Sequence, residues 1–256
     1  MHASPLQLLH AHHRHGPVAP ALPCVLVAGG TGALGNEVLR RMASGMAFRE
    51  VQVLARRPMA TMLRTVSPLQ VAGEDIDHWP PAVGGATVGV VMFEQGRMGH
   101  ERERALWTPR PDQLPALARW LQRSGIHTVA IVLPHDQGRL PAALRAGLAS
   151  LDEQAVAALG FDCVLLVRSA RKPGGPRSGA PVLERLAHWL LSNAHFMLPQ
   201  AERPVGAAKV AELVDMALRL APRGIHGASP EMVWRAAQQD LRETVTQWLR
   251  PEGREL

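Results

Sequence analysis

The chain has 256 residues, of which 46% are apolar and 20% charged, a composition typical of a globular protein. Its 28 Lys and Arg residues exceed its 22 Asp and Glu residues, for a formal net charge of +6, yet only 4% of the residues are aromatic. Basic surfaces that bind single strands usually interleave aromatic side chains, so we expect no nucleic-acid partner. The apolar runs are too short for a bilayer span, so we expect no membrane partner. The two cysteines form no disulfide framework, which favours a reducing, cytoplasmic location.

Residues 1–22 are expected to form a flexible tail ahead of the first strand. The tail holds five of the twelve histidines, at positions 2, 10, 12, 13 and 15. A His-rich tract can bind metal ions, but no cysteine or carboxylate completes a ligand set of fixed spacing here. We therefore expect no metal site, and we treat residues 23–256 as one domain.

Short apolar runs alternate with helical periodicity through the first two thirds of the chain. A helix is expected from Leu34, because apolar residues recur there every four positions, and it should stop at Gly45. Strands bounded by helices in this order predict an α/β fold, a doubly wound, mostly parallel Rossmann sheet with helices on both faces. The predicted strands are 24–28, 51–55, 69–73, 86–93, 127–133 and 161–168, and the later helices are 112–124 and 140–159.

The last third of the chain, from about residue 170 to 256, is expected to form a small substrate-binding or lid part. It begins with a Gly- and Pro-rich loop at 170–181, followed by helices at 182–193 and 206–220 and a short strand near 224–228. A single final helix is predicted to start at Pro230, with Ser229 as its N-cap.

A glycine-rich turn joins the first predicted strand to the first helix. Its pattern is G-x-x-G-x-x-G, in the strand–turn–helix context that dinucleotide-binding proteins use. Glycines permit a tight turn and close approach of a pyrophosphate, and the helix N-terminus offers free N–H groups and a positive dipole end. The turn predicts a nicotinamide dinucleotide as ligand. Its residues are Gly29, Gly30, Thr31, Gly32, Ala33, Leu34 and Gly35.

Two arginines follow the second strand where an acidic residue usually binds the adenosine ribose. Arg56 and Arg57 occupy this strand end, and no carboxylate is present there. A guanidinium complements a 2′-phosphate in charge and in bidentate geometry. The pair therefore favours NADP over NAD, unless both arginines are merely solvated.

Three segments of the sequence resemble the atypical short-chain dehydrogenase/reductases. They are the GGTGALG turn, the strand ending VLARRP at 53–58, and LGFDCVLLVRS at 159–169. Within that family, the sequence is most similar to NAD(P)-binding proteins like the HIV Tat-interacting tumour suppressor and its bacterial relatives. The stretch LPQAERPVGAAKVAELVDMAL at 198–218 resembles that subgroup's C-terminal region, so the resemblance covers roughly residues 23–230.

This resemblance implies a role for several residues. The glycines of the turn would hold the pyrophosphate, and Arg56 would face the 2′-phosphate. An Asp followed by an aliphatic residue usually contacts the adenine in this family, and Asp75 with Ile76 matches that place. A solvated loop acid is an equally good interpretation of Asp75.

The chain departs from the family where hydride-transferring members carry a Tyr-x-x-x-Lys pair. The corresponding places fall near Arg145 and Ala149, and the chain contains no Tyr at all. Glu94, after the fourth strand, and His135, after the fifth, are weak candidates for a replacement acid. Two functions stay open. One is a non-catalytic NADP(H)-binding protein that senses redox state or serves as a subunit for a protein partner. The other is an NADPH-dependent oxidoreductase with a rebuilt site for an unknown small molecule.

Overall fold

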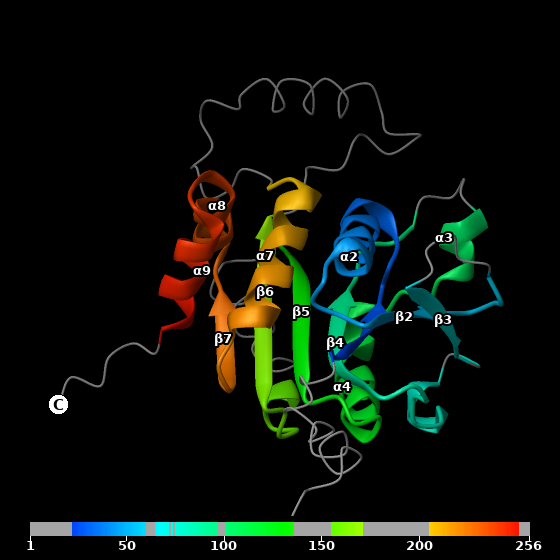
Figure 1. Cartoon of the computed structure of the whole chain (residues 1–256). Helices are drawn as coiled ribbons and strands as arrows, with labels where there is room; N and C mark the ends of the chain where they lie inside the picture. Colours follow the sequence, from blue (N-terminus) through cyan, green and yellow to red (C-terminus); the bar gives the residue numbers. More distant parts are fainter. Residues whose placement is uncertain are drawn as a thin grey trace, which may run out of the picture.

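The computed structural model describes residues 22–59, 65–71, 73, 75–96, 101–135, 155–170 and 205–250. Seven parallel strands form one sheet in these ranges, in the order β3-β2-β1-β4-β5-β6-β7 (Figure 1). This confirms the predicted doubly wound α/β fold. The strands are β1 (Cys24–Ala28), β2 (Glu50–Ala55), β3 (Val66–Gln70), β4 (Ala86–Met92), β5 (Thr128–His135), β6 (Cys163–Ala170) and β7 (Gly224–Ala228).

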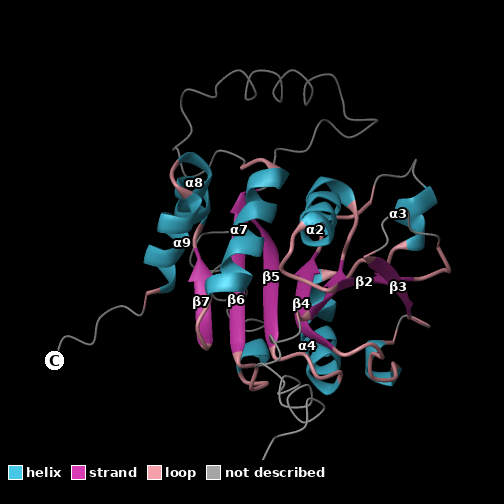
Figure 2. Ribbon diagram, viewed as in Figure 1, coloured by secondary structure: helices cyan, strands magenta, loops and turns pink. Residues whose placement is uncertain are grey.

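Helices cover both faces of the sheet, as Figure 2 shows. One face carries α2 (Gly32–Ser44), α7 (Ala207–Leu220), α8 (Pro230–Gln238) and α9 (Leu241–Leu249), whose apolar residues share one core with the strands. The other face carries α4 (Leu114–Arg123) and a short 3₁₀ helix, Ile76–His78, in a second core. The helix α3 (Glu101–Ala105) follows β4, and a 3₁₀ turn, Pro111–Gln113, precedes α4.

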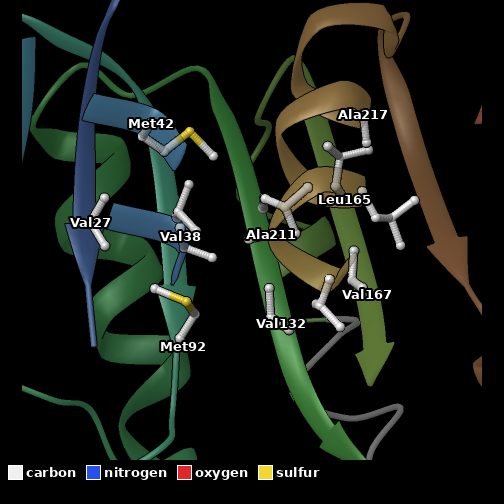
Figure 3. Close-up of a cluster of buried hydrophobic side chains, with 14 of the residues drawn as sticks. Val27, Val38, Met42, Met92, Val132, Leu165, Val167, Ala211 and Ala217 are labelled. Carbon is white, nitrogen blue, oxygen red and sulfur yellow. The ribbon is translucent and has the colours of Figure 1, made fainter. Parts of the chain in front are cut away.

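The first strand shows why the chain folds as two layers of core around a sheet. Val25 and Val27 belong to the core under α2 and α7, whereas Leu26 belongs to the core under α4. Side chains of a strand alternate between faces, so a strand that is apolar throughout must be covered on both sides. Figure 3 shows Val27 of β1 in this core, together with Val38 of α2 and Ala211 of α7.

A buried carboxylate joins the two helices that lie over the first core. Asp215 of α7 is 1% exposed, and its oxygens accept hydrogen bonds from Arg41 of α2 at 2.9 Å and from Arg219 of α7 at 3.0 and 2.9 Å. A buried charge needs this kind of pairing to offset its desolvation. The cluster therefore fixes α2 against the C-terminal part of the sheet.

Two predicted elements differ in the structure. The third strand spans Val66–Gln70 rather than 69–73, with Pro68 in it, which is tolerated because β3 lies at the sheet edge. The final helix is two helices, because Asp240 starts a new one: its Oδ1 accepts the Glu243 N–H at 2.7 Å. Ser229 caps α8, as predicted. The predicted helix at 182–193, the greater part of that at 140–159, residues 171–181 of the predicted loop and residues 1–21 of the tail lie outside the described residues.

Candidate dinucleotide site at the β1–α2 turn

The glycine turn lies at the point where the strand order reverses. The chain winds from β1 outward through β2 to β3, and then returns to place β4 on the other side of β1. In open α/β sheets, ligands bind in the crevice that this reversal creates at the carboxyl ends of the strands. The turn after β1 and the loop after β4 therefore form the two walls of the candidate site.

Two glycines of the turn are required by close backbone packing, and a third is favoured by its backbone conformation. Gly29 has φ +83°, and a Cβ there would collide with the backbone carbonyl of Met92 in β4. Gly35 lies one helical turn into α2, where a Cβ would be 2.5 Å from the carbonyl carbon of Gly30. Gly32 has φ +70°, a left-handed conformation that glycine adopts without steric cost. The turn thus brings β1, β4 and α2 close together.

Thr31 is buried, and its hydroxyl is used inside the protein. Its Oγ1 donates to the backbone carbonyl of Glu94 at 2.6 Å and shares a hydrogen bond with the Thr108 hydroxyl at 2.7 Å. Although Thr31 is the N-cap residue of α2, its side chain accepts none of the helix N–H groups. Thr31 therefore joins the glycine turn to the segments that follow β4.

The carboxylate at the first turn of α2 belongs to Glu94, a residue outside the helix. The Leu34 N–H donates to Glu94 Oε2 at 2.8 Å, and α2 has no acidic residue of its own in this turn. The Glu94 side chain also covers Gly32, where a Cβ would be 2.5 Å from both Cγ and Cδ. Gly32 is buried, Leu34 is partly buried, and Ala33 and Glu94 itself are exposed. A carboxylate is favourable here because the helix dipole presents its positive end.

A second acid lies beside the same helix turn. Asn36 Nδ2 donates to the Gly32 carbonyl at 2.7 Å and to Glu103 Oε1 at 3.0 Å. Glu103 belongs to α3, and its side chain also packs close to Gly96 in the loop after β4. Asn36 therefore attaches α3 to the start of α2.

The chain after α3 returns across the carboxyl ends of β1 and β2. We call residues 105–108 the crossing segment. The Trp107 N–H donates to the Leu54 carbonyl at 2.9 Å, and its carbonyl accepts the Gly29 N–H at 3.2 Å. Leu106 makes an antiparallel bridge with Ala55. The Trp107 indole is buried and packs edge-to-face on another tryptophan, Trp79, at a centroid distance of 4.9 Å. The crossing segment is thus held firmly over the strand ends.

The two arginines expected to select NADP follow β2 directly and are exposed. The backbone N–H groups of Arg56 and Arg57 both donate to the Ala105 carbonyl, at 2.7 and 3.4 Å. The crossing segment therefore determines where both side chains leave the backbone. Their role toward a 2′-phosphate stays a prediction.

The pair expected to contact the adenine starts the 3₁₀ helix after β3. Asp75 is its N-cap: Oδ1 accepts the Asp77 N–H at 3.1 Å, and Oδ2 lies 2.8 Å from His78 Nδ1. Ile76 is 3% exposed and belongs to the core under α4. These contacts give both residues a structural role, and adenine binding stays a prediction.

The remaining site residues of the sequence prediction lie partly beyond the described ranges. His135 is the last residue of β5 and is paired with Ala170 of β6. Arg145 and Ala149, the places of the absent Tyr and Lys, lie outside the described residues. Within the described ranges, no three His, Cys, Asp or Glu side chains gather as a metal site requires. Among the same residues, no helix combines the length and apolarity needed to cross a bilayer.

No motif in the sequence indicated Trp107, Thr108, Asn36 or Glu103 as site residues. Each of them makes a hydrogen bond to a residue more than 50 positions away in the chain. Periodicity and local motifs report neighbours within one turn or one strand, so no pattern in one sequence could have indicated these pairs.

The backbone of the turn is suited to a dinucleotide, whereas the side chain that covers the turn opposes its binding. The backbone of the turn has the tight, glycine-lined form that a pyrophosphate needs. The Glu94 carboxylate, however, covers Gly32 and accepts the Leu34 N–H. A pyrophosphate at these groups and Glu94 in its present position exclude each other, both by space and by like charge.

No family model matches this chain, and no curated protein matches it. Solved structures match it at 13–19% identity and TM-scores of 0.38–0.49. The triphenylmethane reductase of Citrobacter sp., complexed with NADP(H), is 14% identical with a TM-score of 0.49, over 80% of this chain and 69% of that one. A nucleoside-diphosphate-sugar epimerase from Staphylococcus aureus is 13% identical with a TM-score of 0.46, over 90% and 92%. At these values the likenesses carry no functional information, and the fold assignment rests on the strand order of this chain.

Proposed function

We propose that the protein binds a nicotinamide dinucleotide at the β1–α2 turn and belongs to the atypical short-chain dehydrogenase/reductases. The observation that carries the proposal is the glycine turn at the reversal of strand order, where this sheet type binds its ligands. The turn residues 29–35 would hold the pyrophosphate. The dinucleotide would supply hydride chemistry, while the chain would bind and orient it.

NADP(H) is the preferred form of the dinucleotide. Arg56 and Arg57 are exposed at the end of β2, next to the crossing segment, and no carboxylate replaces them at that strand end. A ribose hydroxyl would find no acidic acceptor there, whereas a 2′-phosphate would find two guanidinium groups.

Calorimetry with NADPH and NADH tests this preference. We expect NADPH to bind at least about tenfold more tightly, since a charge-assisted contact to the 2′-phosphate contributes on that order. Arg56→Ala should abolish the difference by weakening NADPH alone. Arg223→Ala, which removes an exposed arginine from the start of β7, is the matched control and should leave both affinities unchanged. Equal affinities in the wild type would contradict the proposal.

We further propose that the protein senses the dinucleotide or presents it to a protein partner. It does not use the dinucleotide in conventional short-chain catalysis. The chain has no Tyr to serve as the proton donor of that chemistry. A panel of aldehydes and ketones with NADPH should show no turnover above background. Robust reduction of simple ketones would overturn this part of the proposal and leave the binding proposal intact.

An NADPH-dependent oxidoreductase acting on an activated small molecule is the alternative. It is favoured by His135, which ends β5 at the same edge of the sheet as the glycine turn. Quinones and enones need less acid assistance, which is typically worth about 10²–10⁴-fold. Turnover of these acceptors that His135→Ala abolishes would establish the alternative.

A further inference from the structure

The start of α2 is capped by a side chain that comes from the opposite wall of the candidate site. Glu94 lies 60 positions beyond Leu34 in the chain, yet its Oε2 accepts the Leu34 N–H at 2.8 Å. Its Cγ and Cδ lie directly over Gly32. A carboxylate and a phosphate make the same demands on a helix N-terminus, namely N–H donors and the positive end of the dipole.

We infer that the Glu94 carboxylate occupies the place of the dinucleotide pyrophosphate, so that this residue limits the affinity of the site. The inference rests on the proposed function and adds how the affinity of that site is limited by the protein itself. Binding of either dinucleotide requires that the Glu94 side chain turns away from Gly32 and Leu34. The ligand then competes with a group of the protein for the same donors.

The contacts around Glu94 confine this opening to its side chain. Its backbone carbonyl accepts a 2.6 Å hydrogen bond from the buried Thr31 hydroxyl, which Thr108 also contacts. The Glu94 residue itself is exposed, so its side chain can rotate into solvent while the loop stays in place. Rotation of an exposed side chain is fast, so binding should proceed without a slow conformational phase.

The expected size of the effect follows from the competition. A capping contact of this kind favours the capped form by about fivefold to tenfold, and the apparent affinity falls by the same factor when only the open form binds. Like charges in contact add to the penalty whenever Glu94 stays close to the bound ligand. Removing the side chain should therefore lower the Kd for a dinucleotide by about tenfold.

Calorimetry of NADPH and NADH binding to Glu94→Ala tests the inference. Both Kd values should fall by about tenfold, and the ratio between them should stay unchanged, because the pyrophosphate is common to both ligands. Glu94→Gln keeps an oxygen for the Leu34 N–H but loses the charge, so its Kd values should fall less. Glu37→Gln is the matched control: it removes one carboxylate from α2 that pairs with Arg40, and it should change neither Kd.

The hydrogen exchange of backbone amides gives a readout that needs no ligand. In Glu94→Ala the Leu34 amide should exchange faster, while the Met232 amide, which Ser229 caps on α8, should be unchanged. Unchanged exchange at Leu34 would overturn the inference.

The outcomes also separate this inference from the proposed function. If the wild type and Glu94→Ala bind the dinucleotides equally well, Glu94 does not compete with them, and the inference fails while the proposed function stands. If neither protein binds a dinucleotide, the proposed function fails, and the inference fails with it.

Discussion

The N-terminus of α2 differs from those of α8 and α9 in where its cap comes from. Ser229 and Asp240 each precede their helix and accept an N–H group three residues later, at 3.3 and 2.7 Å. Thr31 stands in the same position before α2, but its hydroxyl is bonded to Glu94 and Thr108 instead. A distant carboxylate, Glu94, caps α2. A local cap such as Ser229 only satisfies an N–H group at the start of its own helix. The Glu94 cap comes from across the candidate site and therefore also occupies that site.

The difference follows from what surrounds each helix start. Ser229 and Asp240 are themselves exposed, and at each of these helix starts the short side chain of the N-cap residue is the acceptor. The α2 start is enclosed between β1, β4 and the crossing segment, where Thr31 is 1% exposed. Because of this packing, the Thr31 hydroxyl does not cap α2, and the Leu34 N–H bonds to the distant Glu94 carboxylate instead.

Replacing Gly29 should have the largest effect, because it disrupts the turn that encloses the α2 start. A Cβ on Gly29 would collide with the Met92 carbonyl, and the backbone there has φ +83°. We expect Gly29→Ala to lower the free energy of unfolding by about 3 kcal/mol or more, measured by urea denaturation.

The matched control for Gly29 is Gly125, which has nearly the same backbone conformation, φ +85°, but no atom within 4 Å of an added Cβ. Gly125→Ala should cost only the strain of the left-handed conformation, about 1–2 kcal/mol. Equal losses in the two variants would show that the close approach of β4 to the turn contributes nothing.

Replacing Thr31 tests whether its hydroxyl serves the tertiary structure rather than the helix. Thr31→Val leaves the Thr108 hydroxyl and the Glu94 carbonyl without this partner. We expect a loss of about 1–3 kcal/mol in thermal or urea unfolding, because unpaired buried polar groups are costly.

Thr246→Val is the corresponding control on α9, where the hydroxyl donates to the Arg242 carbonyl at an exposed position. It should change the free energy of unfolding by less than about 0.5 kcal/mol. A similar small effect at Thr31 would indicate that its buried hydrogen bonds are replaced by water.

Removing the cap from each kind of helix start should change the dinucleotide affinity in one case and leave it unchanged in the other. Asp240→Ala and Glu94→Ala each delete the acceptor of one N–H group, and each should lower stability by about 1 kcal/mol. Dinucleotide affinity should rise only in Glu94→Ala. A gain in Asp240→Ala, measured by the same calorimetry, would contradict the assignment of the site to α2.

The smallest expected effect is on the pH dependence of stability, and it comes from the thiol of Cys163 in the core, which is not part of any of the three helix starts. Burial, with a smaller contribution from Asp162, raises the pKa of the Cys163 thiol above its ordinary value. A thiol with a raised pKa in the folded state binds its proton more tightly there than when unfolded. The stability it contributes is fully present below the unfolded thiol's pKa and is lost as pH rises through the folded value. Cys163→Ala should therefore flatten the alkaline limb of the stability curve, measured by urea unfolding from about pH 8 to 10.

The elements whose signals are local could be predicted from the amino-acid sequence. Apolar runs bounded by helical periodicity predicted where the strands lie along the chain, because a strand buried on both faces must be apolar throughout. The Ser229 cap with Pro230, the stop at Gly45 and the glycine turn were also readable, since each depends on neighbours a few residues away. The break at Asp240 has a local signal too, the Asp side chain that accepts the Glu243 N–H, but the sequence prediction treated the region after Pro230 as a single helix.

The groups that lie over the glycine turn are visible only in the folded chain. The return of residues 105–108 to β2 and the contact of Glu94 with Leu34 join residues separated by about 50 to 60 positions. Such contacts depend on the reversal of strand order, which brings the end of β4 beside the end of β1. The sequence therefore indicated a turn suited to a pyrophosphate, whereas the folded chain revealed that its own carboxylate reaches the same N–H group, because spatial proximity at a sheet edge leaves no periodic trace in one sequence.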